Sequence, residues 1–275
     1  MTLTIASTIT LNNGAEMPLF GLGVFRDGPG AETENAVTWA LEAGYRAIDT
    51  AAAYGNEAEV GKIVASGLVP REEVFVTSKV ATGDLSYERT KAAFDESIRR
   101  LGLDYIDLYL IHWPVNDWQG AWRALEEIYE AGGLKAIGVS NFLQHHLEEL
   151  FDRAKIRPAV NQIEFHPYLQ QPSLQDFCRQ HDIAITAWAP IMKGRVMDVP
   201  ALAEIGAKYD KTAVQVTLRW MLQSNIITIP KSAKKERILS NADLFDFELS
   251  DEDIQTMNAL DKNERIGPHP DRMGK

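Results

Sequence analysis

Short apolar runs alternate with amphipathic stretches along almost the whole chain. A run of about four to eight apolar residues between turn signals is typical of a buried strand, and apolar positions three and four apart are typical of a helix. Such runs predict eight strands, in chain order 19–23, 45–48, 74–78, 105–111, 136–139, 159–163, 183–187 and 226–229. Because a polar loop and an amphipathic stretch follow these runs, the pattern predicts parallel βα units.

The segments between these strands carry the helical pattern. The helices that we expect lie at 34–42, 87–101, 121–131, 143–154, 173–181, 213–223, 235–241 and 251–260, with a further one beginning near Asn56. Asn12, Asn13 and Gly14 separate two short alternating runs, 7–11 and 15–18, and predict a hairpin because Asn-Gly tolerates positive φ. A polar tail follows from residue 261, and we expect it to cross one mouth of the fold.

Together these elements predict a single α/β domain over residues 1–275. Eight alternating units with no linker rich in Pro, Gly or Ser favour a (β/α)8 TIM barrel, with the N-terminal β-hairpin closing one end. A doubly wound sheet is the rival fold. It would carry a glycine-rich turn after the first strand, but residues 21–26 hold two glycines and lack the third of the dinucleotide fingerprint.

Composition narrows the class of function. The contents of 45% hydrophobic and 24% charged residues are those of a globular protein. A formal net charge of -11 argues against a nucleic-acid partner. The one cysteine, Cys178, suits a reducing compartment and a place in the core. With no signal-peptide pattern and no apolar window of membrane-spanning length, we expect a cytoplasmic protein without a membrane partner.

Three successive predicted strands end in chemically active residues. These are Asp49, Lys79 and His112, and Tyr54 lies in the loop that follows Asp49. The carboxyl ends of barrel strands meet at one mouth, where barrel enzymes keep their chemistry. Taken singly, Asp49 could cap a turn, Tyr54 could pack, Lys79 could face solvent and His112 could be structural. Under the barrel geometry we expect the four to act together.

This combination suits the reduction of a carbonyl group. A carbonyl that accepts hydride becomes an alkoxide, and a phenol can protonate it if a neighbouring ammonium lowers the phenol pKa from about 10. We expect Lys79 to lower the pKa of Tyr54, Asp49 to hold Lys79, and His112 to orient the carbonyl oxygen. No metal is required, and His145, His146, His166 and His181 lack a zinc-ligand spacing.

A basic cluster follows the last predicted strand of this acidic chain. Lys231, Lys234, Lys235 and Arg237 lie beside the expected amino end of a helix, where a phosphate group is readily held. For Lys234 and Lys235, a solvated charged surface is the alternative.

Five motifs in order show that the sequence resembles the aldo-keto reductase superfamily over nearly its full length. They lie at 44–57, 101–114, 138–142, 161–164 and 229–232. Within the family the chain is similar to short bacterial members near the 2,5-diketo-D-gluconate reductases and the glyoxal and methylglyoxal reductases. The resemblance implies a barrel, NADPH, and hydride transfer to small aldehydes and ketones. It also implies that Tyr54 is the proton donor, Lys79 and Asp49 tune it, and His112 orients the substrate.

The same resemblance implies a set of cofactor contacts. Ser140, Asn141 and Gln162 would bind the nicotinamide carboxamide, and Trp188 would stack on the ring. The other implied positions are Gly23, Val24 and Phe25, the pyrophosphate loop Ala189, Pro190 and Ile191 with the residues up to Arg195, and Lys231, Ser232, Arg237 and Asn241 for the 2′-phosphate and adenine. Ser240 departs from the glutamate that many family members carry there.

A short loop at 115–120 and a short polar tail leave little chain for a deep apolar pocket. We therefore expect an open mouth for small or polar carbonyls such as methylglyoxal or keto sugars. We also expect a monomer. Candidate substrate contacts are Phe25, His112, Trp113 and Trp118, although these aromatic residues could simply pack the rim. Two other functions stay open: a barrel aldolase with Lys79 as its Schiff-base lysine, and a module that binds NADPH without useful turnover.

Overall fold

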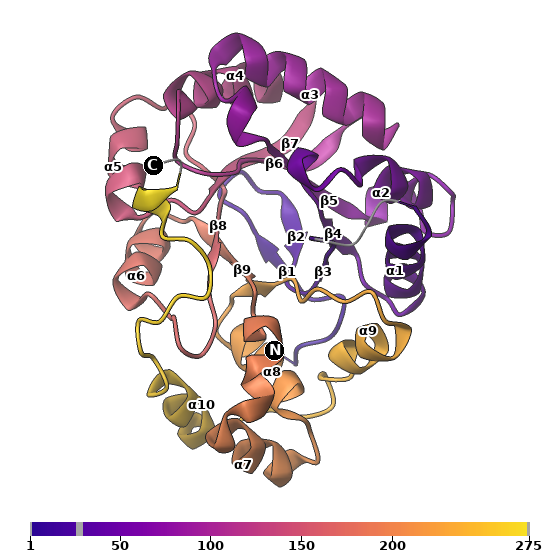
Figure 1. Ribbon diagram of the computed structural model, residues 1–275, viewed down its shortest axis with the longest axis vertical. Coiled ribbons are helices and arrows are strands. Elements are labelled where there is room, and N and C mark those ends of the chain that lie inside the picture. Colours follow the sequence, from indigo (N-terminus) through magenta and orange to yellow (C-terminus); the bar gives the residue numbers. More distant parts are fainter. Residues whose placement is uncertain (1, 26–29, 274–275) are drawn as a thin grey trace.

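The computed structural model describes residues 2–25 and 30–273, and its centre is a curled parallel sheet (Figure 1). The eight strands lie in chain order from β3 to β10, so each strand pairs with the one before it in sequence. Their bounds are β3 Leu22–Gly23, β4 Ala47–Asp49, β5 Phe75–Val80, β6 Ile106–Ile111, β7 Leu134–Ser140, β8 Val160–Glu164, β9 Ala184–Trp188 and β10 Ile227–Thr228. All eight predicted strands are confirmed, and the sequential order excludes the doubly wound rival.

Helices surround this sheet on the outside (Figure 1). Their bounds are α1 Ala31–Glu42, α2 Glu57–Val64, α3 Tyr87–Leu101, α4 Trp118–Glu130, α5 Gln144–Phe151, α6 Pro172–Gln180, α7 Pro200–Tyr209, α8 Ala213–Gln223, α9 Lys235–Ala242 and α10 Asp251–Asn258. The predicted ends of α3 and α8 are confirmed to the residue. Both helices have strong caps: the Ser86 side chain accepts from the Arg89 amide, and Thr212 forms a capping box with Gln215. No predicted range covers α7, which starts at Pro200.

The two edges of the sheet are joined by hydrogen bonds. Phe20 and Thr228 form an isolated parallel bridge, and so do Gly23 and Lys231. The Gly21 amide donates to the Thr228 carbonyl at 3.0 Å, and the Thr228 amide donates to the Leu19 carbonyl at 2.9 Å. These bonds bring the end of β3 beside the basic segment that follows β10.

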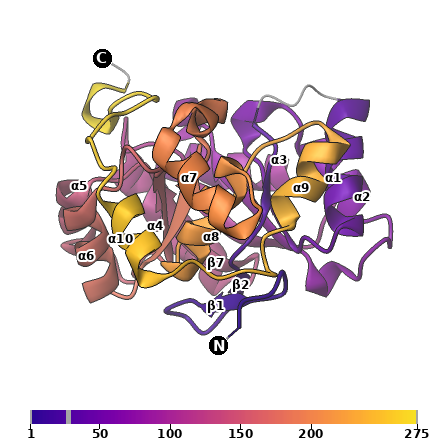
Figure 2. The same cartoon turned by 90° about the horizontal axis from the view of Figure 1, so that it is seen from below.

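The predicted hairpin lies at the amino ends of the strands. It consists of β1, Thr8–Thr10, and β2, Glu16–Pro18. Asn12 donates to the carbonyl of Pro158 at 3.0 Å and Asn13 to that of Lys135 at 2.8 Å, at the starts of β8 and β7. The 3-10 segment η5, Pro270–Arg272, near the end of the described residues, lies at the opposite end of the sheet (Figure 2). Within the described residues, no helix combines the length and the apolarity needed to cross a membrane.

Helix α2, which follows the loop that carries Tyr54, packs very closely on the end of α3. A Cβ atom added at Gly61 would lie 1.8 Å from the carbonyl oxygen of Leu101. Only glycine therefore permits this approach, because the obstacle is backbone and cannot rotate away.

We expect Gly61→Ala to lower the free energy of unfolding by about 1–3 kcal/mol, the usual cost of overpacking. This is opposite in sign to the helix preference for alanine, which is worth about 1 kcal/mol. Urea unfolding measures the difference. The matched control is Gly83→Ala, where an added Cβ meets nothing within 4 Å. A Gly61→Ala protein as stable as the control would contradict the close helix contact.

Candidate active site

A buried ion pair lies at the carboxyl end of the strands. Lys79 in β5 is fully buried, and its Nζ lies 2.6 Å from Oδ1 of Asp49, the last residue of β4. The same Nζ donates to the carbonyl of Thr50 at 2.8 Å. Burial lowers the pKa of Lys79, but Asp49 and Tyr54 together raise it by more, so the net shift is upward. Lys79 is therefore a fixed ammonium group inside the fold.

Gln162 holds the other carboxylate oxygen of this pair. Its Nε2 donates to Oδ2 of Asp49 at 2.6 Å, from β8 across the interior of the sheet. The sequence analysis placed Gln162 at the nicotinamide and did not predict this bond. No local pattern could reveal it, because 113 residues separate the two.

Tyr54 ends a short 3-10 turn, Ala52–Tyr54, and its hydroxyl lies beside Lys79. Nζ of Lys79 is 3.5 Å from the Tyr54 hydroxyl oxygen and 5.1 Å from the ring centroid. Burial raises the pKa of the Tyr54 phenol, and the Lys79 charge lowers it only in part. The net direction is opposite to the one that we expected from the sequence, because burial outweighs the ammonium. The phenol thus carries its proton at neutral pH.

His112 follows β6 and faces the same phenol. Its ring centroid lies 5.9 Å from that of Tyr54, and the two planes cross at 72°. Burial and, after it, the charge of Lys79 lower the pKa of His112 to about 3. A neutral imidazole can donate one hydrogen bond, here beside the tyrosine hydroxyl. Asp49, Tyr54, Lys79 and His112 thus lie together, as we expected from the sequence.

A hydrogen-bonded chain of polar residues extends the site toward β9. The indole Nε1 of Trp188 donates to Oδ1 of Asn141 at 2.8 Å. Nδ2 of Asn141 donates to the carbonyl of His112 and to Oγ of Ser140, both at 3.0 Å. Ser140 Oγ in turn donates to the carbonyl of Gln162 at 2.9 Å. These four positions, which the resemblance assigned to the nicotinamide, therefore lie together.

The positions expected at the phosphate end lie on the same side of the sheet. Lys231 and Arg237 are exposed, and Ser232 is buried before the amino end of α9. Ser232 Oγ accepts from the Lys234 amide at 3.1 Å, and Asn241 is buried within α9. Basic side chains and a helix amino terminus suit a phosphate.

The other positions that the resemblance assigned to the cofactor lie at the end of β3 and after β9. The Val24 amide donates to the carbonyl of Asp49 at 3.0 Å, and the parallel bridge with Lys231 holds Gly23 beside the basic segment. After β9 the backbone turns sharply, with φ of 53° at Ala189. The positions that follow are Pro190 and Ile191, before the 3-10 segment η4, Met192–Asp198.

The four expected substrate contacts differ in exposure. Phe25 is 49% exposed, and its ring centroid lies 4.9 Å from that of Tyr54. His112 is half-buried. Trp113 and Trp118 are buried, and the Trp118 ring packs edge-on against Phe142 at 5.1 Å. Phe25 is therefore the open aromatic surface beside the phenol.

Three groups that could hold a metal ion meet away from this network. Nε2 of His145 lies 3.0 Å and Nε2 of His146 3.3 Å from Oδ1 of Asp271. Nδ1 of His146 accepts from the Leu143 amide, so the proton of the neutral ring is assigned to Nε2, pointing at Asp271. Burial and the neighbouring His145 lower the pKa of His146 to about 4, which keeps the ring neutral. The approach of Asp271 to His146 is therefore not an ion pair with a charged imidazolium.

Comparison with known proteins gives a family match over most of the chain. The family model described as the aldo/keto reductase family matches residues 20–262. The glyoxal reductase of Bacillus subtilis is 52% identical over 99% of this chain and 99% of its own length. The 9,11-endoperoxide prostaglandin H2 reductase of Trypanosoma cruzi is also 52% identical, over 96% of this chain and 94% of its own.

A solved structure adds the cofactor. The aldo-keto reductase of Bombyx mori, in complex with NADP, superposes with a TM-score of 0.90 at 37% identity. The match covers 98% of this chain and 97% of that one.

We expect Lys79→Met to lower the free energy of unfolding by about 3–5 kcal/mol, because it leaves the buried Asp49 carboxylate without its counter-charge. The double variant Asp49→Asn/Lys79→Met should recover part of that loss, since neither charge then remains. Denaturant unfolding measures both. The control is Lys91→Met, which breaks the ion pair with Glu127. The two side chains of that pair are 44% and 46% exposed, so the free energy of unfolding should change little. A double variant less stable than Lys79→Met would contradict this account.

Proposed function

The chain belongs to the aldo/keto reductase family, and on that premise we propose that it reduces small aldehydes and ketones to alcohols, with Tyr54 as proton donor. It is an NADPH-dependent oxidoreductase, like its relatives. One observation carries the proposed mechanism. A protonated phenol, a fixed ammonium and a neutral imidazole converge at the carboxyl ends of β4, β5 and β6.

Each group has a distinct part in this mechanism. Bound NADPH supplies the hydride that adds to the carbonyl carbon. The Tyr54 hydroxyl gives its proton to the oxygen as negative charge develops there, and Lys79 stabilises the resulting phenolate. Asp49 keeps Lys79 charged and in place. The His112 imidazole donates a hydrogen bond that orients the carbonyl oxygen.

The contacts of Lys79 favour this mechanism over a Schiff-base aldolase. A nucleophilic lysine must lose its proton, and enzymes achieve this with a lowered pKa. The pKa of Lys79 is raised instead, because the combined effect of Asp49 and Tyr54 outweighs burial. Its ammonium is also committed to two oxygens, one of Asp49 and the carbonyl of Thr50.

The placement of the remaining residues supports an extended cofactor along the rim. We assign Ser140, Asn141, Gln162 and Trp188 to the nicotinamide. The half-buried Trp188 ring, fixed through its Nε1, suits stacking. We assign Gly23, Val24 and Phe25 to the cofactor as well. To the phosphates and adenine we assign Ala189, Pro190, Ile191, Lys231, Ser232, Arg237 and Asn241.

The same proposal covers the architecture around the site. The bridges between Phe20 and Thr228 and between Gly23 and Lys231 support a closed (β/α)8 barrel. We propose one domain over residues 1–275. We also propose a monomeric cytoplasmic enzyme with no nucleic-acid or membrane partner, in keeping with its charge of -11 and single cysteine.

Sequence identity alone does not choose the substrate. The relatives named for glyoxal and for a prostaglandin endoperoxide are equally identical to this chain. The short segment 112–117 between β6 and α4 and the exposed Phe25 favour an open mouth, so we propose small carbonyls such as methylglyoxal or keto sugars. Trp113 and Trp118 remain proposed walls.

Tyr54→Phe should lower kcat for methylglyoxal about 100- to 10,000-fold, the usual contribution of a general acid. NADPH affinity should change little, because the ring is kept. The control is Tyr87→Phe, which removes a hydroxyl that bonds Glu127 on the outer helices. Steady-state rates followed by NADPH absorbance test this, and a Tyr54→Phe enzyme with near wild-type kcat would rule out Tyr54 as the donor.

For substrate choice, kcat/KM should be higher for methylglyoxal than for a bulky steroid ketone. Phe25→Ala should lower kcat/KM for methylglyoxal about 3- to 10-fold by removing one aromatic contact. Leu68→Ala, at another exposed apolar residue 45% exposed, is the control and should leave it unchanged. A preference for the steroid ketone, or no effect of Phe25→Ala, would overturn the open-mouth proposal.

A further inference from the structure

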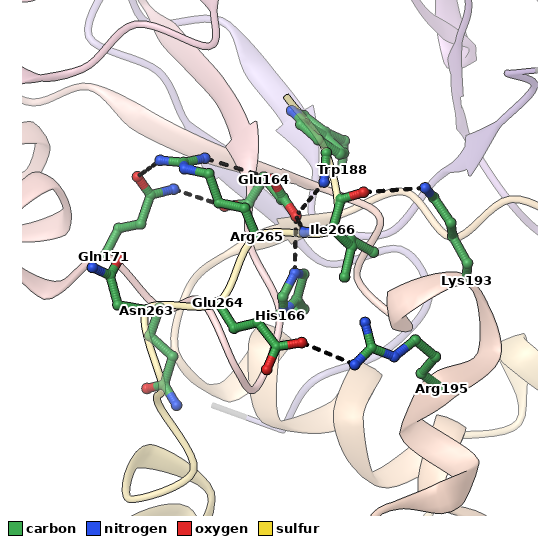
Figure 3. Close-up of polar contacts among 12 residues, drawn as sticks. Glu164, His166, Gln171, Trp188, Lys193, Arg195, Asn263, Glu264, Arg265 and Ile266 are labelled. Carbon is green, nitrogen blue, oxygen red and sulfur yellow. Dashed lines mark hydrogen bonds and ion pairs between the residues drawn. The ribbon is translucent and has the colours of Figure 1, made fainter. Parts of the chain in front are cut away.

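A buried carboxylate at the end of β8 binds the backbone of the C-terminal tail (Figure 3). The Glu164 side chain is fully buried, and its Oε1 accepts from the amides of Ile266 at 2.6 Å and Gly267 at 3.1 Å. Nε2 of His166 also lies 3.1 Å from Oε1. We call residues 264–267 the tail clasp.

The charge of Glu164 is balanced by a closed ring of polar contacts. Arg265 Nη1 lies 3.5 Å from Oε2, and Arg265 Nη2 donates to Oε1 of Gln171 at 3.0 Å. Gln171 Nε2 then returns to the Glu164 carbonyl at 2.7 Å (Figure 3). Burial raises the pKa of Glu164, but the His166 and backbone bonds lower it by more, so the anchor is ionised at neutral pH.

The tail clasp packs closely against Trp188, the residue that we assign to the nicotinamide ring. A Cβ atom added at Gly267 would lie 2.3 Å from Cη2 of Trp188 and 3.2 Å from Oε2 of Glu164. Asn141 fixes the indole through its Nε1 at 2.8 Å. The indole thus has its nitrogen held by Asn141 and its six-membered ring packed against the clasp backbone.

The clasp also contacts η4, which continues from the proposed pyrophosphate loop. Lys193 Nζ donates to the carbonyl of Ile266 at 3.3 Å, and Arg195 Nη2 donates to Oε1 of Glu264 at 2.9 Å (Figure 3). Both contacts are exposed and contribute little alone. Met192 and Lys193 have φ of 52° and 56°, a conformation that the surroundings must maintain.

We propose that the tail clasp positions Trp188 for the nicotinamide half of the cofactor, with Glu164 as its buried anchor. Glu164 and Gly267 are then positioning residues, since they act through Trp188. The inference rests on the proposed function, in which Trp188 stacks on the nicotinamide. It has a specific consequence: the clasp acts on the nicotinamide half of NADPH and not on the adenosine half, which lies near Arg237.

Two ligands separate these halves. NADPH spans both, whereas adenosine 2′-monophosphate carries only the adenosine end. Gly267→Ala, which displaces the indole or the clasp, and Glu164→Gln, which removes the charge of the anchor, should each weaken NADPH about 3- to 10-fold. Binding of adenosine 2′-monophosphate should stay unchanged, which a general loss of structure would not produce. Calorimetric titration measures both ligands.

The matched controls are a glycine in open space and a buried carboxylate elsewhere. Gly83→Ala adds a Cβ with no neighbour within 4 Å. Asp253→Asn removes the charge of a buried carboxylate that accepts hydrogen bonds from Lys208 and Tyr209. Neither should change the ratio of the two affinities. An equal loss for both ligands, or no loss, in Gly267→Ala and Glu164→Gln would overturn the clasp.

Trp188→Ala distinguishes the clasp from the proposal beneath it. It should weaken NADPH at least as much as Gly267→Ala does. If Trp188→Ala leaves NADPH affinity unchanged, the assignment of Trp188 to the nicotinamide fails and the clasp fails with it. If Trp188→Ala weakens NADPH while the two clasp variants do not, only the clasp is wrong.

Discussion

The site depends on one buried ion pair, Lys79 with Asp49. Two charges out of water are tolerated only when the geometry supplies counter-charge and hydrogen bonds on every side. Here Thr50 and Gln162 complete the set, so strands β4, β5 and β8 must keep their spacing for the pair to exist. The fixed ammonium in turn acts to lower the pKa values of both Tyr54 and His112, against burial in the first and together with it in the second. In the proposed mechanism the sheet is therefore part of the chemistry, because it holds a positive charge beside the phenolate that would form on Tyr54.

Local patterns predicted the elements well. The eight strands follow from apolar runs between turn signals, and the limits of α3 and α8 follow from their caps. Asp49, Lys79 and His112 could be grouped because each stands at the end of a successive predicted strand, and parallel pairing brings such ends together. No predicted helix range covers α7. It starts at Pro200 after a segment with several residues of positive φ, where local preference gives little signal.

What the sequence did not reveal are contacts between distant segments and the balance of opposing effects. Three hydrogen bonds join residues far apart in the chain. They are the bonds from Gln162 to Asp49, from the Ile266 amide to Glu164, and between His145 and Asp271. The direction of the Tyr54 pKa shift depends on how deeply the phenol is buried as well as on its distance from Lys79. Composition and spacing carry no measure of depth, so the sign of that shift required coordinates.

The hairpin and the tail lie at opposite ends of the sheet, and this makes the two chain ends unequal as attachment points (Figure 2). An added domain or affinity tag at the amino end would extend from beside the hairpin, away from Tyr54 and His112. The same addition at the carboxyl end would follow the residues around Asp271, which contacts His145 and His146 of α5 a few positions after the tail clasp. Immobilisation through the amino end therefore leaves the mouth open, whereas immobilisation through the carboxyl end loads the segment that borders it.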